Sequence, residues 1–212
     1  MNAAGIAASG APLGRAKAAV VMLHGRGASA QSMLSFADVF ALPDIAYLAP
    51  QAPGSTWYPY SFLAPFAQNE PALSHALATV AGVVSHLADH GCPPQRLVLL
   101  GFSQGGCLAL EYAARHAQRY GGVVGLSAGL IGPPGTPRAY PGLLSGTPVF
   151  IGCSNDDDHI PLERVHESTA VLRRMGGDVA ERIYPAMGHT INHDEVKHVR
   201  TILDGLVRSD AA

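Results

Sequence analysis

Short apolar runs alternate along this chain with longer segments in which apolar residues recur at helical spacing. The unbroken apolar runs predict strands that are buried on both faces, at residues 18–23, 44–48, 97–100, 121–127 and 147–152. One run with alternating polarity, residues 178–184, predicts an edge strand. The helical spacing predicts helices at about residues 29–40, 70–89, 107–117, 161–175 and 192–207. This alternation of strands and helices predicts an α/β fold with a mostly parallel sheet.

The chain shows no internal repeat and no linker, which predicts a single α/β domain over residues 16–212. Residues 1–15 are small and weakly patterned, and we expect them to form a frayed tail. Residues 128–146 are rich in Gly and Pro and have no period, so we expect a loop that crosses the mouth of the site. This loop is too short and too broken for a helical cap, so no large cap domain is expected.

Composition excludes several classes of protein. The 212 residues are 48% hydrophobic and 14% charged with a net charge of −2, so no basic stripe exists to bind nucleic acid. Three widely spaced cysteines favour neither a disulfide framework nor a zinc site, which indicates a reducing compartment and a cytoplasmic location. We see no signal peptide at the N-terminus and no apolar run long enough to span a membrane. Scattered Ala, Leu and Val positions leave a homodimer open.

The candidate chemistry centres on Ser103. The strand predicted at residues 97–100 runs directly into Gly101-Phe102-Ser103-Gln104-Gly105, and a predicted helix follows. The G-x-S-x-G pattern between a strand and a helix is typical of the nucleophile elbow of α/β-hydrolases, whose sharp turn requires small residues where backbones crowd. Ser103 would then stand at a helix N-terminus, where backbone N–H groups point toward the reacting centre.

Two further residue types complete a candidate triad. An Asp near residue 157 and then His189 follow Ser103, in the chain order Ser, Asp, His of α/β-hydrolases. The His would accept the proton of the weakly nucleophilic hydroxyl, and the carboxylate would orient the imidazole. Asp156, Asp157 and Asp158 are adjacent, and only one of them can point at His189, so this pattern leaves the choice open.

The loop after the first predicted buried strand reads His24-Gly25-Arg26-Gly27. In α/β-hydrolases this loop supplies one N–H of the oxyanion hole, and the residue after the nucleophile supplies the other. We therefore predict that the backbone N–H groups of Arg26 and Gln104 form the oxyanion hole, with no need for their side chains. We interpret His24 as a residue that orders the loop, because a His before Gly at a strand end usually forms hydrogen bonds there.

An aromatic loop after the second buried strand contains Trp57 and Tyr58. We predict that these two side chains, together with Ile160 and Met187, form an apolar wall for the substrate. The alternative is that Trp57 packs beneath its own loop and contacts no substrate. No group of residues has the spacing of a metal site, so no metal ligand and no cofactor are predicted.

Several motifs together resemble one family of serine hydrolases. They are Leu23-His24-Gly25-x-Gly27, Gly101-Phe102-Ser103-Gln104-Gly105-Gly106, Asp157-x-x-Ile160-Pro161 and Gly188-His189. The chain is similar to the carboxylesterases and acyl-protein thioesterases, also called the phospholipase/carboxylesterase family. This resemblance implies an α/β-hydrolase fold and hydrolysis of carboxylic esters or thioesters without a cofactor. Family members carry Asp-x-x-Val-Pro at the triad acid, so the resemblance selects Asp157.

Two departures from the family pattern narrow the expected substrate. Arg26-Gly27-Ala28 stands where members with acyl-protein activity carry Leu-Gly-Asp, and the run from Asp156 to His159 is unusually acidic. Both favour a bacterial type of esterase acting on small-molecule esters of short to medium acyl chain. The alternatives are a thioesterase or lysophospholipase for longer chains, a non-catalytic binding protein, and a dienelactone-type hydrolase with a Cys nucleophile. Cys107 is expected to serve helix packing instead.

Overall fold

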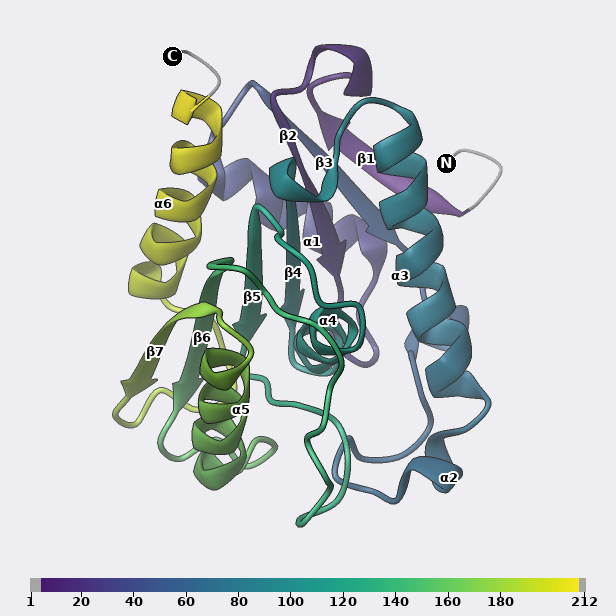
Figure 1. The fold of residues 1–212 in the computed structure, drawn as a ribbon, viewed down its shortest axis with the longest axis vertical. Coiled ribbons are helices and arrows are strands. Elements are labelled where there is room, and N and C mark those ends of the chain that lie inside the picture. Colours follow the sequence, from purple (N-terminus) through teal and green to yellow (C-terminus); the bar gives the residue numbers. More distant parts are fainter. Residues whose placement is uncertain (1–4, 210–212) are drawn as a thin grey trace.

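The central sheet positions every candidate functional residue. In the computed structural model, which describes residues 5–209, seven strands lie in the order β1-β3-β2-β4-β5-β6-β7 (Figure 1). The strands are β1 (Ile6–Gly10), β2 (Ala18–Leu23), β3 (Ile45–Pro50), β4 (Leu97–Phe102), β5 (Gly122–Leu126), β6 (Pro148–Ser154) and β7 (Asp178–Tyr184). All neighbouring pairs are parallel except β1 with β3, which confirms the predicted mostly parallel sheet.

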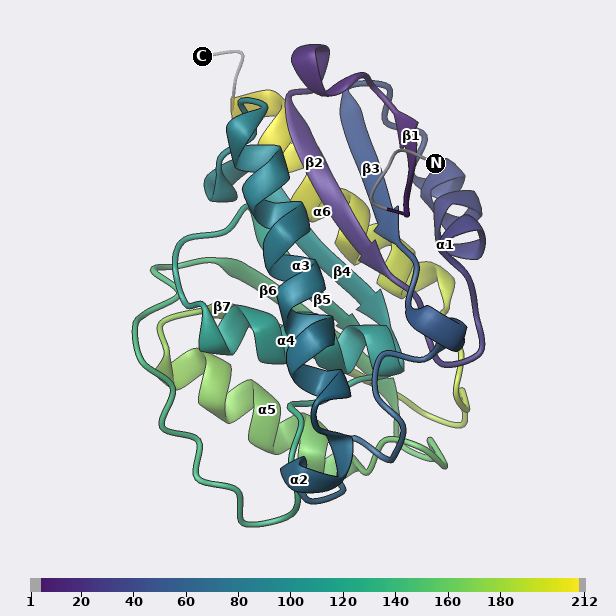
Figure 2. The ribbon, with the colours of Figure 1, turned by 90° about the vertical axis from the view of Figure 1, so that its right-hand side faces the viewer.

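Helices cover both faces of the sheet, as Figure 2 shows. The helices are α1 (Ala30–Ala37), α2 (Phe66–Asn69), α3 (Ala72–Asp89), α4 (Gln104–Arg115), α5 (Leu162–Arg174) and α6 (His193–Ser209). Short 3₁₀ turns are η1 (Leu13–Arg15), η2 (Asp38–Phe40), η3 (Pro53–Ser55) and η4 (Pro94–Arg96). Helices α3, α4 and α5 pack on one face, whereas α1 and α6 pack on the other. No large cap domain is present in the described part of the chain, as predicted.

The continuous apolar runs are explained by this sandwich of layers. Every residue of β2, β3 and β5 is buried. Successive side chains of a strand point to opposite faces, so both sets need apolar residues when helices cover both sides. In β2, for example, Val21 packs in the core beneath α3 and α4, while Val20 packs in the core beneath α1 and α6.

The expectation of a frayed tail over residues 1–15 is wrong for the residues that the structure describes. Residues 6–10 form β1, which pairs antiparallel with β3 at the edge of the sheet, and residues 13–15 form η1. An edge strand needs only backbone pairing on one side, so small residues with little pattern suffice. Residues 1–4 of the predicted tail lie outside the described part.

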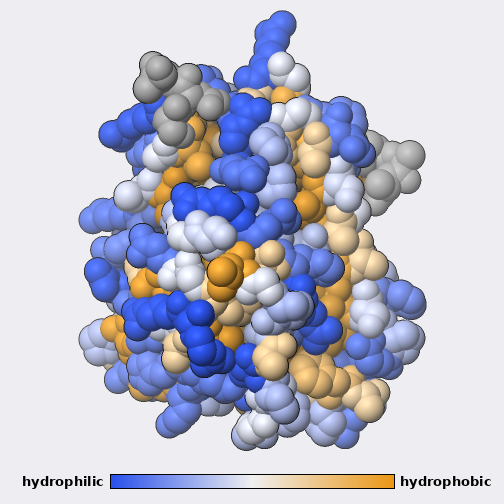
Figure 3. Space-filling model, in the orientation of Figure 1, coloured by the Kyte–Doolittle hydropathy of each residue, from blue (hydrophilic) through white to orange (hydrophobic). Residues whose placement is uncertain are grey.

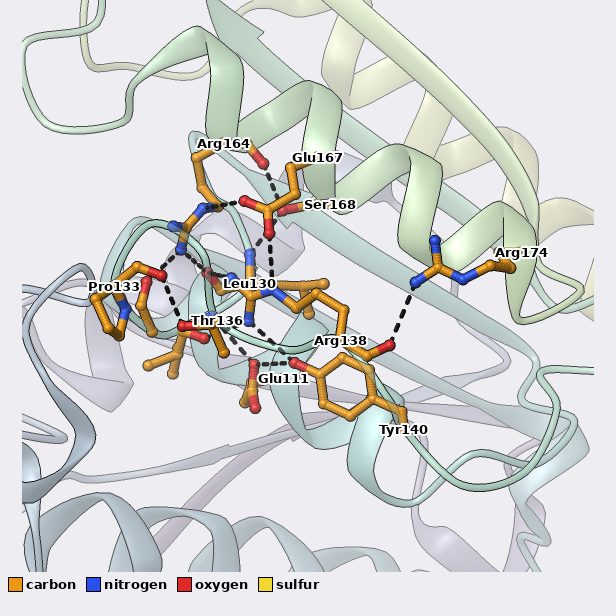
Figure 4. Close-up of polar contacts among 12 residues, drawn as sticks. Glu111, Leu130, Pro133, Thr136, Arg138, Tyr140, Arg164, Glu167, Ser168 and Arg174 are labelled. Atoms are coloured by element: carbon orange, nitrogen blue, oxygen red, sulfur yellow. Dashed lines mark hydrogen bonds and ion pairs between the residues drawn. The ribbon is translucent and has the colours of Figure 1, made fainter.

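The connection between β5 and β6 is held against α4 and α5 by a network of polar contacts (Figure 4). The Glu111 side chain is 1% exposed and accepts hydrogen bonds from Arg115, Tyr140 and the Ile131 N–H. Arg164, on α5, donates to the carbonyl oxygens of Leu130 and Gly132. None of residues 128–146 lines the cavity that opens over Ser103, so the predicted crossing of the site mouth is wrong.

The outer surface is mixed in polarity. On the face drawn in Figure 3, polar and charged residues surround small apolar areas. Among the described residues, large hydrophobic side chains that are exposed are Val39, Tyr60 and Leu143. No helix within residues 5–209 combines the length and the hydropathy needed to cross a bilayer.

Candidate active site

Ser103 lies in the sharp turn that the G-x-S-x-G pattern predicts. Strand β4 ends at Phe102 and α4 begins at Gln104, so Ser103 alone connects them, with φ 53° and ψ −121°. Such a positive φ is strained for a residue with a side chain and is typical of functional turns. A Cβ on Gly105 would overlap the Leu23 carbonyl group, so the crossing of β2 and α4 requires glycine there.

The three predicted triad residues form one hydrogen-bonded chain. Ser103 follows β4, Asp157 follows β6 and His189 follows β7, so all three lie at the carboxyl edge of the sheet. The Nε2 atom of His189 lies 2.8 Å from Ser103 Oγ, and its Nδ1 atom lies 2.8 Å and 2.9 Å from the two Asp157 oxygens. The imidazole ring also packs near the rings of Phe102 and His159, at centroid distances of 5.0 Å and 4.5 Å.

Geometry separates the three adjacent aspartates. The Asp157 side chain is fully buried and also accepts hydrogen bonds from the His159 and Ile160 N–H groups. Burial raises the pKa of Asp157, but these bonds and the His189 ring outweigh burial and hold the pKa below its ordinary value. Asp156 instead bonds Ser154 and the Gly188 N–H, which lowers its pKa, and Asp158 is exposed at the cavity rim. Only Asp157 of the three hydrogen-bonds to His189.

The two predicted oxyanion-hole residues flank Ser103. Gln104 is the first residue of α4, so its N–H has no partner within the helix. The loop that carries Arg26 passes close to the nucleophile, since a Cβ on Gly25 would lie 3.5 Å from Ser103 Cβ. Both residues line the cavity beside Ser103. This placement is suited to stabilising negative charge on a carbonyl oxygen held against Ser103.

A cavity of about 600 Å³ opens over Ser103 and His189. Of the four residues predicted to form its wall, Tyr58 and Ile160 line it. Trp57 does not, because it is 3% exposed and turned inward, with its indole Nε1–H donating to the His24 carbonyl oxygen at 2.8 Å. Met187 does not line it either, and its sulfur contacts the Asn192 side-chain amide. The position of Trp57 therefore fits the alternative interpretation, in which its side chain packs beneath its own loop.

The sequence analysis did not assign several residues that line the cavity. They are Pro59, Tyr60, Ser61, Phe62, Phe102, Asp158 and His159. Residues 59–62 continue the aromatic loop, and Phe102 directly precedes the nucleophile. Their position in the sequence therefore indicated that they lie near the site. The sequence pattern does not show which of their side chains turn toward the cavity.

The surroundings of His24 and Cys107 indicate structural roles rather than catalytic ones. His24 is buried, and its Nε2 atom accepts the Ala52 N–H at 3.1 Å, which supports the prediction that it orders the loop. Burial lowers the pKa of His24 and thereby favours the neutral ring that can accept this bond. Cys107 is buried one turn into α4, and burial raises the pKa of its thiol to about 12, which opposes the reactive thiolate form.

One group of side chains in the described residues has the proximity needed to hold a metal ion. Ligand atoms of Asp157, His159 and His189 all lie within 4.8 Å of one another. Two of these residues already share the hydrogen bond that orients the imidazole. A metal bound here would therefore displace that bond rather than assist it.

Comparison with known proteins agrees with the hydrolase-like geometry of the site. The sequence profile of the phospholipase/carboxylesterase family matches residues 5–207. The chain belongs to this family. A solved phospholipase/carboxylesterase from Dyadobacter fermentans is 44% identical, with a TM-score of 0.90 and 97% of each chain covered. Family members are hydrolases that cleave esters or thioesters, so the chain is an enzyme of this kind.

Two curated relatives carry the name acyl-protein thioesterase 1. The protein of Emericella nidulans is 25% identical over 91% of this chain and 92% of its own length. The protein of Gibberella zeae is 33% identical, but the match covers 54% of this chain and 50% of that protein. Relatives of this chain are thus named both as thioesterases and, in Oryza sativa, as a probable carboxylesterase.

Proposed function

We propose that this chain is a serine carboxylesterase that cleaves small-molecule esters of short to medium acyl chain through a Ser103-His189-Asp157 triad. The observation that carries the proposal is the continuous chain of hydrogen bonds from Ser103 Oγ through both His189 ring nitrogens to Asp157. Each link has the length expected of a working nucleophile, base and orienting acid.

The steps follow from these contacts. Ser103 Oγ attacks the ester carbonyl carbon while His189 Nε2 takes the hydroxyl proton, and the carbonyl oxygen becomes an oxyanion. The Arg26 and Gln104 N–H groups stabilise that charge. The alcohol leaves with the proton from His189, and an acyl-enzyme remains. Water then attacks the acyl carbon, gives one proton to His189, and releases the acid as Ser103 regains its hydrogen.

The cavity supports a small apolar substrate. Phe62, Phe102 and Ile160 supply apolar surface beside Ser103, and no cap closes over them in the described residues. An acyl chain gains about 0.8 kcal/mol for each buried CH₂ group, so preference rises with chain length only while the cavity covers the added carbons.

A thioesterase of longer chains is the second candidate, because curated relatives are named acyl-protein thioesterases. The same triad serves both reactions, since only the leaving group changes from an alcohol to a thiol. Arg26-Gly27-Ala28 in the oxyanion loop, in place of Leu-Gly-Asp, favours the small ester.

A series of p-nitrophenyl esters from two to sixteen carbons, with matched acyl thioesters, tests the proposal. We expect maximal kcat/KM below twelve carbons, and Ser103→Ala should lose several orders of magnitude in turnover while keeping the wild-type melting temperature. A maximum at twelve carbons or more, or a preference for the thioester, would favour the second candidate. Wild-type turnover in Ser103→Ala would contradict both the esterase and the thioesterase proposals, because each uses Ser103 as the nucleophile.

A further inference from the structure

One wall of the cavity is a backbone segment without regular secondary structure. Residues 57–61 lie between η3 and α2, and Tyr58, Pro59, Tyr60 and Ser61 line the cavity. A segment outside a helix or a sheet still needs partners for its buried N–H and C=O groups. Here side chains supply most of them.

Two side-chain amides hold the segment in the same way. The Gln104 side chain accepts the Trp57 N–H at 2.9 Å and donates to the Tyr58 carbonyl oxygen at 2.8 Å. The Asn69 side chain accepts the Tyr60 N–H at 2.9 Å and donates to the Ser61 carbonyl oxygen at 2.9 Å. Each amide therefore binds the backbone of the segment through one acceptor and one donor.

The Arg26 guanidinium holds the middle of the segment. It donates to the Pro59 carbonyl oxygen at 2.8 Å and to the Tyr60 carbonyl oxygen at 2.7 Å. The two residues whose backbone N–H groups form the candidate oxyanion hole thus also hold the wall with their side chains. Of these two, Gln104 is 6% exposed whereas Arg26 is exposed. Because buried hydrogen bonds are shielded from water, the Gln104 contacts fix geometry more firmly.

We propose that Gln104 is a positioning residue whose side-chain amide fixes the wall of residues 57–61 relative to its own oxyanion-hole N–H. This inference rests on the serine-esterase function proposed above. A substrate lies between the wall and the oxyanion donor, so their separation decides how well the carbonyl oxygen reaches the N–H groups. A displacement of about 1 Å at this point is worth as much as a hundredfold in rate.

Asn69 provides the matched comparison. It is fully buried and makes the same pair of bonds, but it lies in α2 and contributes no group to the oxyanion hole. Loss of Asn69 should loosen the outer end of the wall only. The two amides therefore predict different kinetics: Gln104 affects kcat for every ester, whereas Asn69 affects KM for the longer esters.

Gln104→Met and Asn69→Leu, each close in size to the original side chain, test this difference. With melting temperatures recorded for both, we expect kcat for the acetyl ester to fall about 10- to 100-fold in Gln104→Met. In Asn69→Leu that kcat should stay within about threefold while KM for the longer esters rises. Wild-type kcat and an unchanged acyl-length profile in folded Gln104→Met would overturn the inference.

Gln104→Glu separates positioning from a general loss of packing. In the wild-type protein the Gln104 amide donates a hydrogen bond to the Tyr58 carbonyl oxygen. An ionised carboxylate in its place has no hydrogen to donate, so two acceptors would face each other. Burial raises the pKa of such a carboxyl, and once protonated it again offers one donor and one acceptor. We therefore expect the ratio of variant to wild-type kcat to be lowest near pH 9 and to rise toward pH 5.

Dividing by the wild-type kcat at each pH removes the pH effects that both proteins share. A ratio that stays constant and low across this range would contradict the role of the amide donor. If the wild-type protein itself neither hydrolyses esters nor reacts at Ser103, the proposed function fails, which is a different result from any of these ratios.

Discussion

Two segments that line the cavity are held in place by different chemical groups. Residues 57–61 are held by the side-chain amides of Gln104 and Asn69 and by the Arg26 guanidinium. Residues 158–160, which also line the cavity, and the loop that carries His189 are held by the carboxylates of Asp157 and Asp156. The wall of residues 57–61 therefore needs no ionised carboxylate, whereas the geometry around His189 requires ionised Asp156 and Asp157, whose pKa values are both held below the ordinary value.

Glu195 is a further carboxylate near the loop that carries His189. Its Oε2 atom accepts the Asn192 N–H at 2.8 Å, and the Asn192 side chain accepts the Glu195 N–H at 3.0 Å. This reciprocal pair caps α6 three residues after His189. The Glu195 Oε1 atom is buried and has no hydrogen-bond partner. Burial raises the pKa of Glu195 to about 7, against the opposing effect of the Asn192 N–H, so this carboxyl behaves oppositely to Asp157.

The largest effect should come from Asp157→Asn. The amide still accepts the His159 N–H, but it offers a donor to His189 Nδ1 and stabilises the wrong tautomer, at a cost of about 10⁴ in kcat. Asp156→Asn should cost about tenfold, the equivalent of one hydrogen bond, and Asp158→Asn less. Steady-state kinetics on all three variants measure the contrast. Equal, mild losses would place the triad acid elsewhere.

Trp57→Phe should lower stability without changing specificity. The variant leaves the buried His24 carbonyl oxygen without its indole donor, which costs about 1–3 kcal/mol of unfolding free energy. A domain of this size loses about 2–4 °C in melting temperature per kcal/mol. Phe62→Leu, at a residue that does line the cavity, should instead alter the acyl-length profile. A changed profile in Trp57→Phe would return Trp57 to the substrate wall.

The smallest effect should come from Glu195→Gln, and only above neutral pH. Because the folded-state pKa is raised from its ordinary 4.5 to about 7, the folded protein binds the extra proton between these values. The stabilising contribution is complete below pH 4.5 and is lost as the pH rises through about 7. The Gln variant mimics the protonated form, so its melting temperature should match wild type near pH 5 and exceed it by a few degrees near pH 8. Parallel melting curves across this range would contradict this account of Glu195.

The sequence predicted the parts of the site that depend on the chain order of strands. Ser103, Asp157 and His189 each follow a predicted strand, and parallel strands bring their carboxyl ends to one edge. The choice of Asp157 needed the family resemblance, because spacing alone does not show which of three adjacent carboxylates turns inward.

Features that depend on contacts between distant side chains were not predictable. The inward turn of Trp57 follows from its bond to His24, and the position of residues 128–146 follows from ion pairs such as Arg138 with Glu167. Strand β1 was missed because backbone pairing with β3, rather than an apolar pattern, holds it at the edge.

Covalent labelling with a fluorophosphonate, followed by mass spectrometry, tests the central claim most directly. The reagent reacts with a serine only where a base activates the hydroxyl and an oxyanion hole accepts the phosphonyl oxygen. We predict one adduct per chain in the wild-type protein, located at Ser103, and none in Ser103→Ala. Labelling at another residue, or equal labelling of Ser103→Ala, would contradict the assignment of Ser103 as the nucleophile.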